Sequence, residues 1–170
     1  MENLKEFTMR METTGPEEWK DIPDIDLYMD QVISYMKRQH IGLDEDETLT
    51  SAMINNYIKN GLLPRAKGKR YNREHIGYLT AICLLKQVLT VKESGVLINS
   101  EMEDKDVETF YNQYRDIVMS TFSSVASSVK SDGTKEELVN QAMKMAVSGY
   151  AEILVCKKIL EEIEKEENKI

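Results

Sequence analysis

The sequence predicts an all-α fold in which a helix-turn-helix module of the winged-helix kind precedes a long antiparallel helical hairpin. Apolar residues recur at helical spacing through most of the 170 residues. Glycine, proline and aspartate residues separate these periodic segments, and helix-capping patterns stand where several of them begin. We therefore divide the chain into a flexible N-terminal arm (residues 1–21), a helix-turn-helix domain (22–99) and a helical hairpin (100–170).

The first predicted helix covers residues 25–39. Residues 1–21 before it are polar and show no sustained period, which predicts the flexible arm. Apolar residues then recur at helical spacing, at Ile25, Met29, Val32 and Met36. Pro23-Asp24 would start this helix and Gly42 would end it.

A short second helix, a basic turn and a third helix follow. After the acidic run 44–47, Thr48 or Thr50 can cap a helix that ends at Asn60-Gly61. Pro64 biases the residue before it towards an extended conformation, and residues 65–71, with a glycine in the middle, predict a tight turn or hairpin tip. Asn72 can cap the third helix. The capping box at residues 90–93 opens a fourth helix of one to two turns, which ends near residue 98.

Two long helices make up the predicted hairpin. A capping box at residues 100–103 predicts a helix over 101–131, and Asp132-Gly133 breaks it. Residues 134–165 form the last helix, whose only polar stripe between residues 142 and 156 consists of Lys144, Ser148 and Glu152. A helix that is apolar on most sides must be covered on most sides.

The last helix therefore needs more cover than one hairpin partner can give. We expect a homodimer through the C-terminal helices, with a contact seam at Gly149, Ile153, Cys156, Leu160 and Ile163. The alternative is a monomeric bundle, in which the same face lies against the helix of residues 25–36.

Charge is distributed very unevenly along the chain. The net charge is -8, yet residues 48–73 contain six basic residues and no acidic one. The rest of the chain, with 16 basic and 30 acidic residues, carries -14. Such a local concentration can present an electropositive face on an acidic protein, which favours a polyanionic partner at that face.

The run Met53-Ile54-Asn55-Asn56-Tyr57-Ile58-Lys59-Asn60-Gly61-Leu62-Leu63-Pro64, followed by Arg70-Tyr71 and a helix with Leu79 and Ile82, resembles the DNA-binding head of the MerR class of bacterial regulators. Residues 22–98 are also similar to an uncharacterised bacterial domain-of-unknown-function family related to that head. The resemblance implies a transcriptional regulator that binds double-stranded DNA and responds to an unknown small-molecule or protein effector.

In such a head a recognition helix enters the major groove and a wing contacts phosphates. Asn55 and Asn56 suit the helix, since an Asn amide can pair with adenine. Arg65, Lys67, Lys69 and Arg70 suit the wing. Tyr57 contacts phosphate or packs beneath the wing. The full set of predicted DNA-binding residues is Asn55, Asn56, Tyr57, Lys59, Arg65, Lys67, Lys69, Arg70, Tyr71 and Arg73.

A second interpretation is a protein-interaction adaptor or anti-repressor that has this fold but does not bind DNA. The basic segment would then be a solvated turn or a protein contact.

We expect no enzyme activity, because no catalytic constellation is present, and we expect no cofactor. His40 and His75 stand apart without ligand-spaced partners, so no metal site is predicted. Cys83 and Cys156 sit among apolar residues, so we expect two reduced thiols in the core. No apolar run approaches the length that a membrane-spanning helix needs. We expect a cytoplasmic protein.

Overall fold

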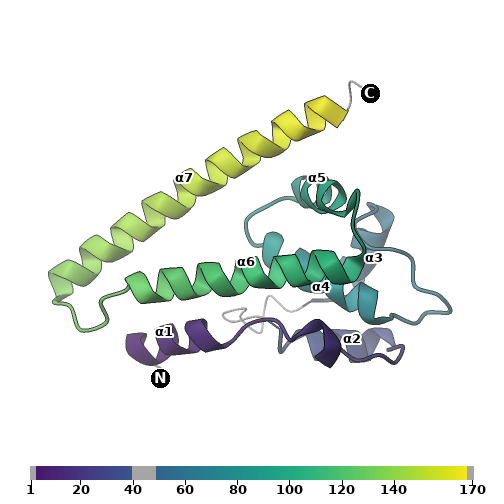
Figure 1. The fold of residues 1–170 in the computed structure, drawn as a ribbon, viewed down its shortest axis with the longest axis horizontal. Coiled ribbons are helices and arrows are strands. Elements are labelled where there is room, and N and C mark those ends of the chain that lie inside the picture. Colours follow the sequence, from purple (N-terminus) through teal and green to yellow (C-terminus); the bar gives the residue numbers. More distant parts are fainter. Residues whose placement is uncertain (1–2, 40–48, 168–170) are drawn as a thin grey trace. The chain divides into compact units, whose positions relative to one another are not determined.

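The computed structural model describes residues 3–39 and 49–167. In this part of the chain the regular structure is helical, with only two isolated β-bridges besides, so the all-α prediction is confirmed. The chain divides into two compact units, Thr14–Val118 and the combination of Met1–Thr13 with Met119–Ile170. Figure 1 shows the elements: α1 (Leu4–Thr13), η1 (Trp19–Asp21), α2 (Met29–Met36), α3 (Ser51–Lys59), α4 (Arg73–Leu85), α5 (Val91–Met102), α6 (Val107–Ser128) and α7 (Lys135–Glu167).

Helix α2 is shorter than the sequence predicted. The backbone of Leu27, inside the predicted helix, instead pairs with Tyr71: the Leu27 N–H donates to the Tyr71 carbonyl over 2.8 Å, and the Tyr71 N–H donates back over 2.9 Å. The helix begins only after Tyr28, whose N–H donates to Gln31 Oε1. A backbone committed to a bridge cannot also make helical hydrogen bonds, which corrects the start from 25 to 29. The predicted stop at Gly42 and the acidic run 44–47 lie outside the described residues.

Helix α3 begins and ends as predicted. Thr50 Oγ1 accepts from the Met53 N–H over 3.2 Å, the side-chain cap expected of threonine. At the other end Gly61 has a φ of 74°. The Gly61 N–H donates to the Ile58 carbonyl and the Leu62 N–H donates to the Tyr57 carbonyl, which is the Schellman arrangement. This turn sends the following Leu62 and Leu63 into the core, where both are buried.

Helices α4 and α5 start at the predicted caps, but the boundary before α6 differs. Asn72 caps α4 and Thr90 caps α5. Helix α5 runs on to Met102, and Ser100, which was expected to open the next helix, donates its hydroxyl to the Val96 carbonyl within α5. Helix α6 starts after Asp106, whose Oδ1 accepts from the Thr109 N–H over 2.8 Å. The carboxylate of Asp106 therefore supplies the cap that was assigned to Ser100.

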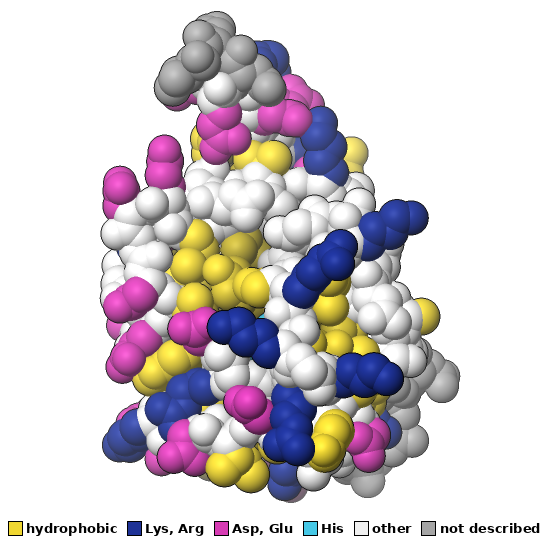
Figure 2. Space-filling view, turned by 90° about the vertical axis from the view of Figure 1, so that its right-hand side faces the viewer, with side chains coloured by type: hydrophobic (Ala, Val, Ile, Leu, Met, Phe, Trp, Pro, Cys, Tyr) yellow, Lys and Arg dark blue, Asp and Glu magenta, His cyan; other side chains and the backbone are white. Residues whose placement is uncertain are grey.

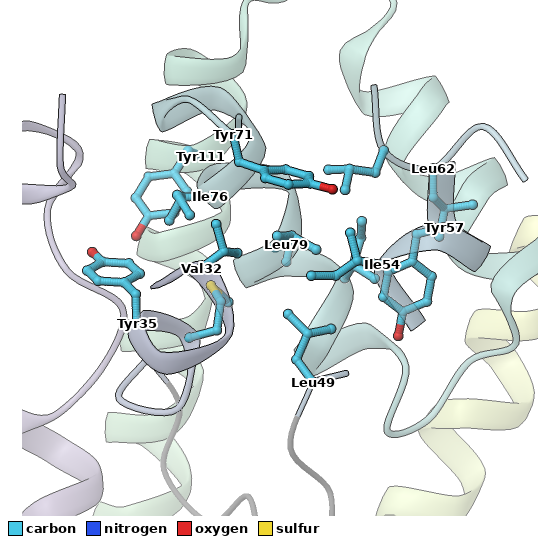
Figure 3. Packing of buried hydrophobic residues seen from close by; sticks show 14 of the residues in the cluster. Val32, Tyr35, Leu49, Ile54, Tyr57, Leu62, Tyr71, Ile76, Leu79 and Tyr111 are labelled. Atoms are coloured by element: carbon cyan, nitrogen blue, oxygen red, sulfur yellow. The ribbon is translucent and has the colours of Figure 1, made fainter. Parts of the chain in front are cut away.

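The core of the 14–118 unit lies between α2, α3, α4 and α6. Figure 3 shows side chains from these helices converging, among them Val32, Ile54, Leu79 and Tyr111, all almost inaccessible to solvent. Gly77 in α4 allows close packing there, because a Cβ at this position would lie 3.0 Å from Trp19 Cζ3.

The N-terminal residues have more structure than the predicted arm. Residues 4–13 form helix α1, although the sequence shows no sustained period there. In the other unit, residues 16–19 are attached by long-range contacts. Tyr111 donates its hydroxyl to the Glu17 carbonyl over 2.7 Å, and Arg115 Nε donates to the Pro16 carbonyl over 2.9 Å. These contacts link partners more than 90 residues apart in sequence, which a local pattern cannot reveal.

The second unit consists of α1, the last part of α6, and α7. Ser127 on α6 donates to the Glu12 carboxylate on α1 over 3.1 Å. Thr134 and Glu137 exchange the two bonds of a capping box at the start of α7, as predicted. Among the described residues, none of the helices combines the length and apolar character needed to cross a membrane.

Candidate nucleic-acid interface

The basic segment forms a tight two-residue turn. The Arg70 N–H donates to the Lys67 carbonyl over 3.0 Å. Between them Gly68 and Lys69 have φ values of 57° and 62°. Positive φ at both central residues is the mark of a type I′ turn, the preferred tip of a two-residue hairpin. The predicted hairpin tip is confirmed, and the turn displays the side chains of Lys67 and Lys69 in solvent.

Two contacts with the segment before α2 hold this turn in place. One is the Leu27–Tyr71 bridge directly beyond it. The other joins Arg70 to Tyr28: Arg70 Nη2 donates to the Tyr28 hydroxyl over 2.9 Å, and the guanidinium lies 4.9 Å from the centroid of the Tyr28 ring. The turn is therefore fixed on the 14–118 unit at both its stem and its side. Tyr28 was not in the predicted site, because nothing local indicates a contact with a residue 42 positions away.

Helix α3 presents the two predicted asparagines to solvent. Both Asn55 and Asn56 are exposed. Asn56 Oδ1 accepts from Asn60 Nδ2 over 3.0 Å, and the Asn56 carbonyl accepts from the same amide over 2.8 Å. Asn56 thus helps to close the C-terminal end of α3, as a capping residue does. Asn55 points outward one residue earlier and is the better placed of the two for an external contact.

Two predicted site residues are buried and a third is half-buried. Tyr57 and Tyr71 are 2% and 4% exposed, so neither ring offers a surface to a phosphate. Burial raises the pKa of the Tyr57 hydroxyl to about 12. Arg73 is half-buried, and its Nε donates to the Ile22 carbonyl over 3.1 Å while its guanidinium lies 5.9 Å from the Trp19 ring. These three residues pack beneath the exposed cations. Tyr57 was expected either to contact phosphate or to pack beneath the wing, and its ring is packed in the core.

The exposed cations of this region are Lys59, Arg65, Lys67, Lys69 and Arg70. They lie between residues 59 and 70, at the end of α3 and along the turn. An acidic side chain shares this region, because the exposed Asp26 directly precedes Leu27, the bridge partner of Tyr71. Figure 2 shows one side of the molecule, where Lys and Arg side chains project among hydrophobic and acidic ones. The surface is of mixed sign, with its positive charge concentrated on the turn.

His75 has a structural role at the start of α4. Its N–H donates to Asn72 Oδ1 and its Nδ1 accepts from the Asn72 N–H, each over 3.2 Å, so the two residues cap the helix reciprocally. Burial lowers the pKa of the His75 imidazole. His40 lies outside the described residues, and in the described part no group of three or more His, Cys, Asp or Glu side chains could hold a metal ion. Cys83 and Cys156 are free thiols.

The comparisons with known proteins give one family. A family described as Domain of unknown function (DUF1836) matches residues 17–114, more than half of the chain. No curated protein and no solved structure matches the chain. The matched region begins with the residues attached to Tyr111 and Arg115 and includes α2 to α5, so it covers the turn, α3 and the core beneath them.

Proposed function

We propose that this chain, which belongs to the DUF1836 family, is a DNA-binding protein that applies α3 and the 65–70 turn to double-stranded DNA. The single observation that carries the proposal is the Lys67–Arg70 turn, held on the folded unit by Tyr28 and by the Leu27–Tyr71 bridge. A cationic tip held on the folded unit is suited to contact phosphates, and the exposed Asn55 of α3 would reach base edges.

The roles of the residues follow from their positions. Arg65, Lys67 and Lys69 are exposed and would pair with phosphate oxygens. Asn55 would make the base contact, as an acceptor and donor pair for adenine. The order of α2, α3, the turn and α4 is also that of a MerR-like winged helix-turn-helix, which supports the same proposal, and a DNA-binding regulator of transcription is the function that this arrangement suits best.

The neighbouring acids favour a second candidate, an adaptor or anti-repressor that binds a protein through the same face. Asp24, Asp26 and Asp30 are exposed in the segment that pairs with Tyr71. A surface of mixed sign is more usual at a protein contact than in a duplex groove, where carboxylates meet phosphates. The adaptor would show no salt-dependent affinity for duplex.

A charge-matched pair of variants tests the proposal. In one, Arg65, Lys67 and Lys69 become Ala; in the other, the exposed Lys130, Lys135 and Lys144 of the second unit become Ala. Both lose three positive charges, so a general electrostatic attraction would suffer equally in both. The proposal expects duplex binding in low salt, measured by fluorescence anisotropy, to fall at least tenfold in the first variant and little in the second. Equal losses in the two variants would refute the assignment of the turn.

A further inference from the structure

Helix α7 exposes a continuous apolar stripe. Its members are 51% to 69% exposed, although all are large hydrophobic side chains: Val139, Met143, Val147, Tyr150 and Leu154. At about 100° per residue these positions fall within roughly 80° of the helix circumference. A row of this kind on a soluble surface usually marks a contact with another molecule.

This stripe is not the seam that the sequence predicted. In that seam Gly149 is exposed, but the other residues are on the more covered side of α7, where Leu160 is buried and Ile153, Cys156 and Ile163 are half-buried. The sequence pattern makes α7 apolar on most sides, and periodicity alone could not tell which of these residues the rest of the chain covers. The row from Val139 to Leu154 is exposed, and Val155 and Ile159 are exposed on another side of the helix.

The spacing of the stripe is nearly the same from either end. Val139 and Leu154 lie about two turns on either side of Val147, and Met143 and Tyr150 lie about one turn on either side. We propose that a second copy of this chain binds the stripe with its own α7 antiparallel. Val139 then faces Leu154 of the other copy, Met143 faces its Tyr150, and the two Val147 side chains meet near the twofold axis.

The charges at the two ends select the antiparallel direction. Glu136 lies one turn before Val139 and Lys157 one turn after Leu154, both in line with the stripe. Antiparallel pairing brings each Glu136 to the Lys157 of the other copy, whereas parallel pairing sets Glu136 against Glu136 and Lys157 against Lys157. Unlike charges at such flanking positions favour one orientation and like charges oppose the other.

The stripe is large enough for a specific dimer. At these exposures each of the five side chains has on the order of 100 Å² of solvent-accessible surface. Two copies that cover this surface fully would bury roughly 1,000 Å² in total. That area meets the lower bound of about 1,000 Å² for a specific protein–protein interface. This inference goes beyond the proposed DNA binding and does not depend on it, since the stripe lies outside the 14–118 unit.

Light scattering on the full chain tests the dimer. The expected mass at micromolar concentration is twice the 19.6 kDa of one chain. Val147→Glu should give a monomer, because it sets two carboxylates against each other at the axis. Ile159→Glu is the matched control, since Ile159 is similarly exposed but lies on another side of α7, and it should remain a dimer. A parent chain of 19.6 kDa, or the same response in both variants, would overturn the proposal.

A short thiol cross-linker tests the direction. The background is Cys156→Ser, and Cys83 can stay, because burial raises the pKa of its thiol to about 12 and slows its reaction. Val147→Cys should link to itself, and its neighbour Ser148→Cys, on the far side of the helix, should not. Val139→Cys and Leu154→Cys should link efficiently only when mixed. Efficient linking of Val139→Cys to itself would indicate parallel helices and contradict the proposal.

Duplex affinity separates this inference from the proposed function. Val147→Glu leaves the 65–70 turn intact, so a monomeric variant that still binds duplex would show that the two surfaces act independently. A dimer without any duplex binding would leave the stripe assignment standing and refute only the DNA proposal.

Discussion

The guanidinium of Arg70 lies over the ring of Tyr28 and donates to its hydroxyl over 2.9 Å, across 42 residues of sequence. The contact joins the basic turn to the segment before α2. It therefore fixes the direction in which Lys67 and Lys69 project, because Lys69 directly precedes Arg70 and the Lys67 carbonyl accepts from the Arg70 N–H.

Removing Tyr28 should weaken DNA binding without changing any charge. Tyr28→Phe loses only the hydroxyl, and Tyr28→Ala also loses the ring. A cation–π contact at an exposed site contributes about 0.5–1 kcal/mol, so we expect Tyr28→Ala to lose about two- to fivefold in duplex affinity and Tyr28→Phe to lose less. Anisotropy titrations of the three proteins check this order. Identical affinities would mean that the turn does not need its support.

The two asparagines of α3 should behave differently. Asn55→Ala is expected to cost about 1–3 kcal/mol on a selected DNA site and little on random duplex, as a base contact does. Asn56→Ala should mainly lower stability, because it removes the bond from Asn60 at the end of α3. Binding to the selected site and urea unfolding of each variant separate the two effects. Loss of site preference in Asn56→Ala alone would reverse the assignment.

Gly77 should tolerate no side chain. A Cβ there would lie 3.0 Å from Trp19 Cζ3 and 3.4 Å from Val107 Cγ1, so we expect Gly77→Ala to lower the free energy of unfolding by about 1–3 kcal/mol. Gly149→Ala is the control within a helix, since a Cβ there would have no neighbour within 4 Å. It should raise stability by up to about 1 kcal/mol through helix propensity. Urea denaturation measures both, and a neutral Gly77→Ala would contradict the close packing.

His75 should make the protein less stable in mild acid. Because burial lowers its folded-state pKa below 6.5, the unfolded chain binds the proton more readily. The stability from the neutral imidazole is thus present above pH 6.5 and is lost as the pH falls towards the folded-state pKa. His75→Gln keeps a residue that suits the third position of a capping box and removes the titration. Unfolding at pH 7 and pH 5 should show a smaller loss in this variant, and an equal loss would exclude His75 as the cause.

The elements that the sequence predicts well are those decided by neighbours in the chain. Thr50, Asn72, Thr90 and Thr134 each accept a bond from a residue three positions on, so their helix starts are visible in a short pattern. The Gly68 turn is equally local. Contacts between residues far apart in the chain could not be predicted from a short pattern. The pairing of Leu27 with Tyr71, which shortens α2, is one of them.

The other differences between the predicted and the observed structure concern the residue that caps α6 and the burial of individual site residues. Ser100 was expected to cap the helix that follows, but it lies within α5, and Asp106 caps α6 instead. Within the site, the asparagines and every basic residue except Arg73 are exposed as the pattern indicated, whereas Arg73 is half-buried and Tyr57 and Tyr71 are buried. An aromatic or long side chain near a charged segment can face either way, and only the packed core decides which.

The salt dependence of duplex binding tests the central claim most directly. If Arg65, Lys67 and Lys69 contact phosphates, the logarithm of the association constant should fall with the logarithm of the salt concentration with a slope of about -3. The measurement is an anisotropy titration of the full chain on a fluorescent duplex at several salt concentrations. A chain that does not bind duplex even near 50 mM salt would contradict the account and favour the adaptor.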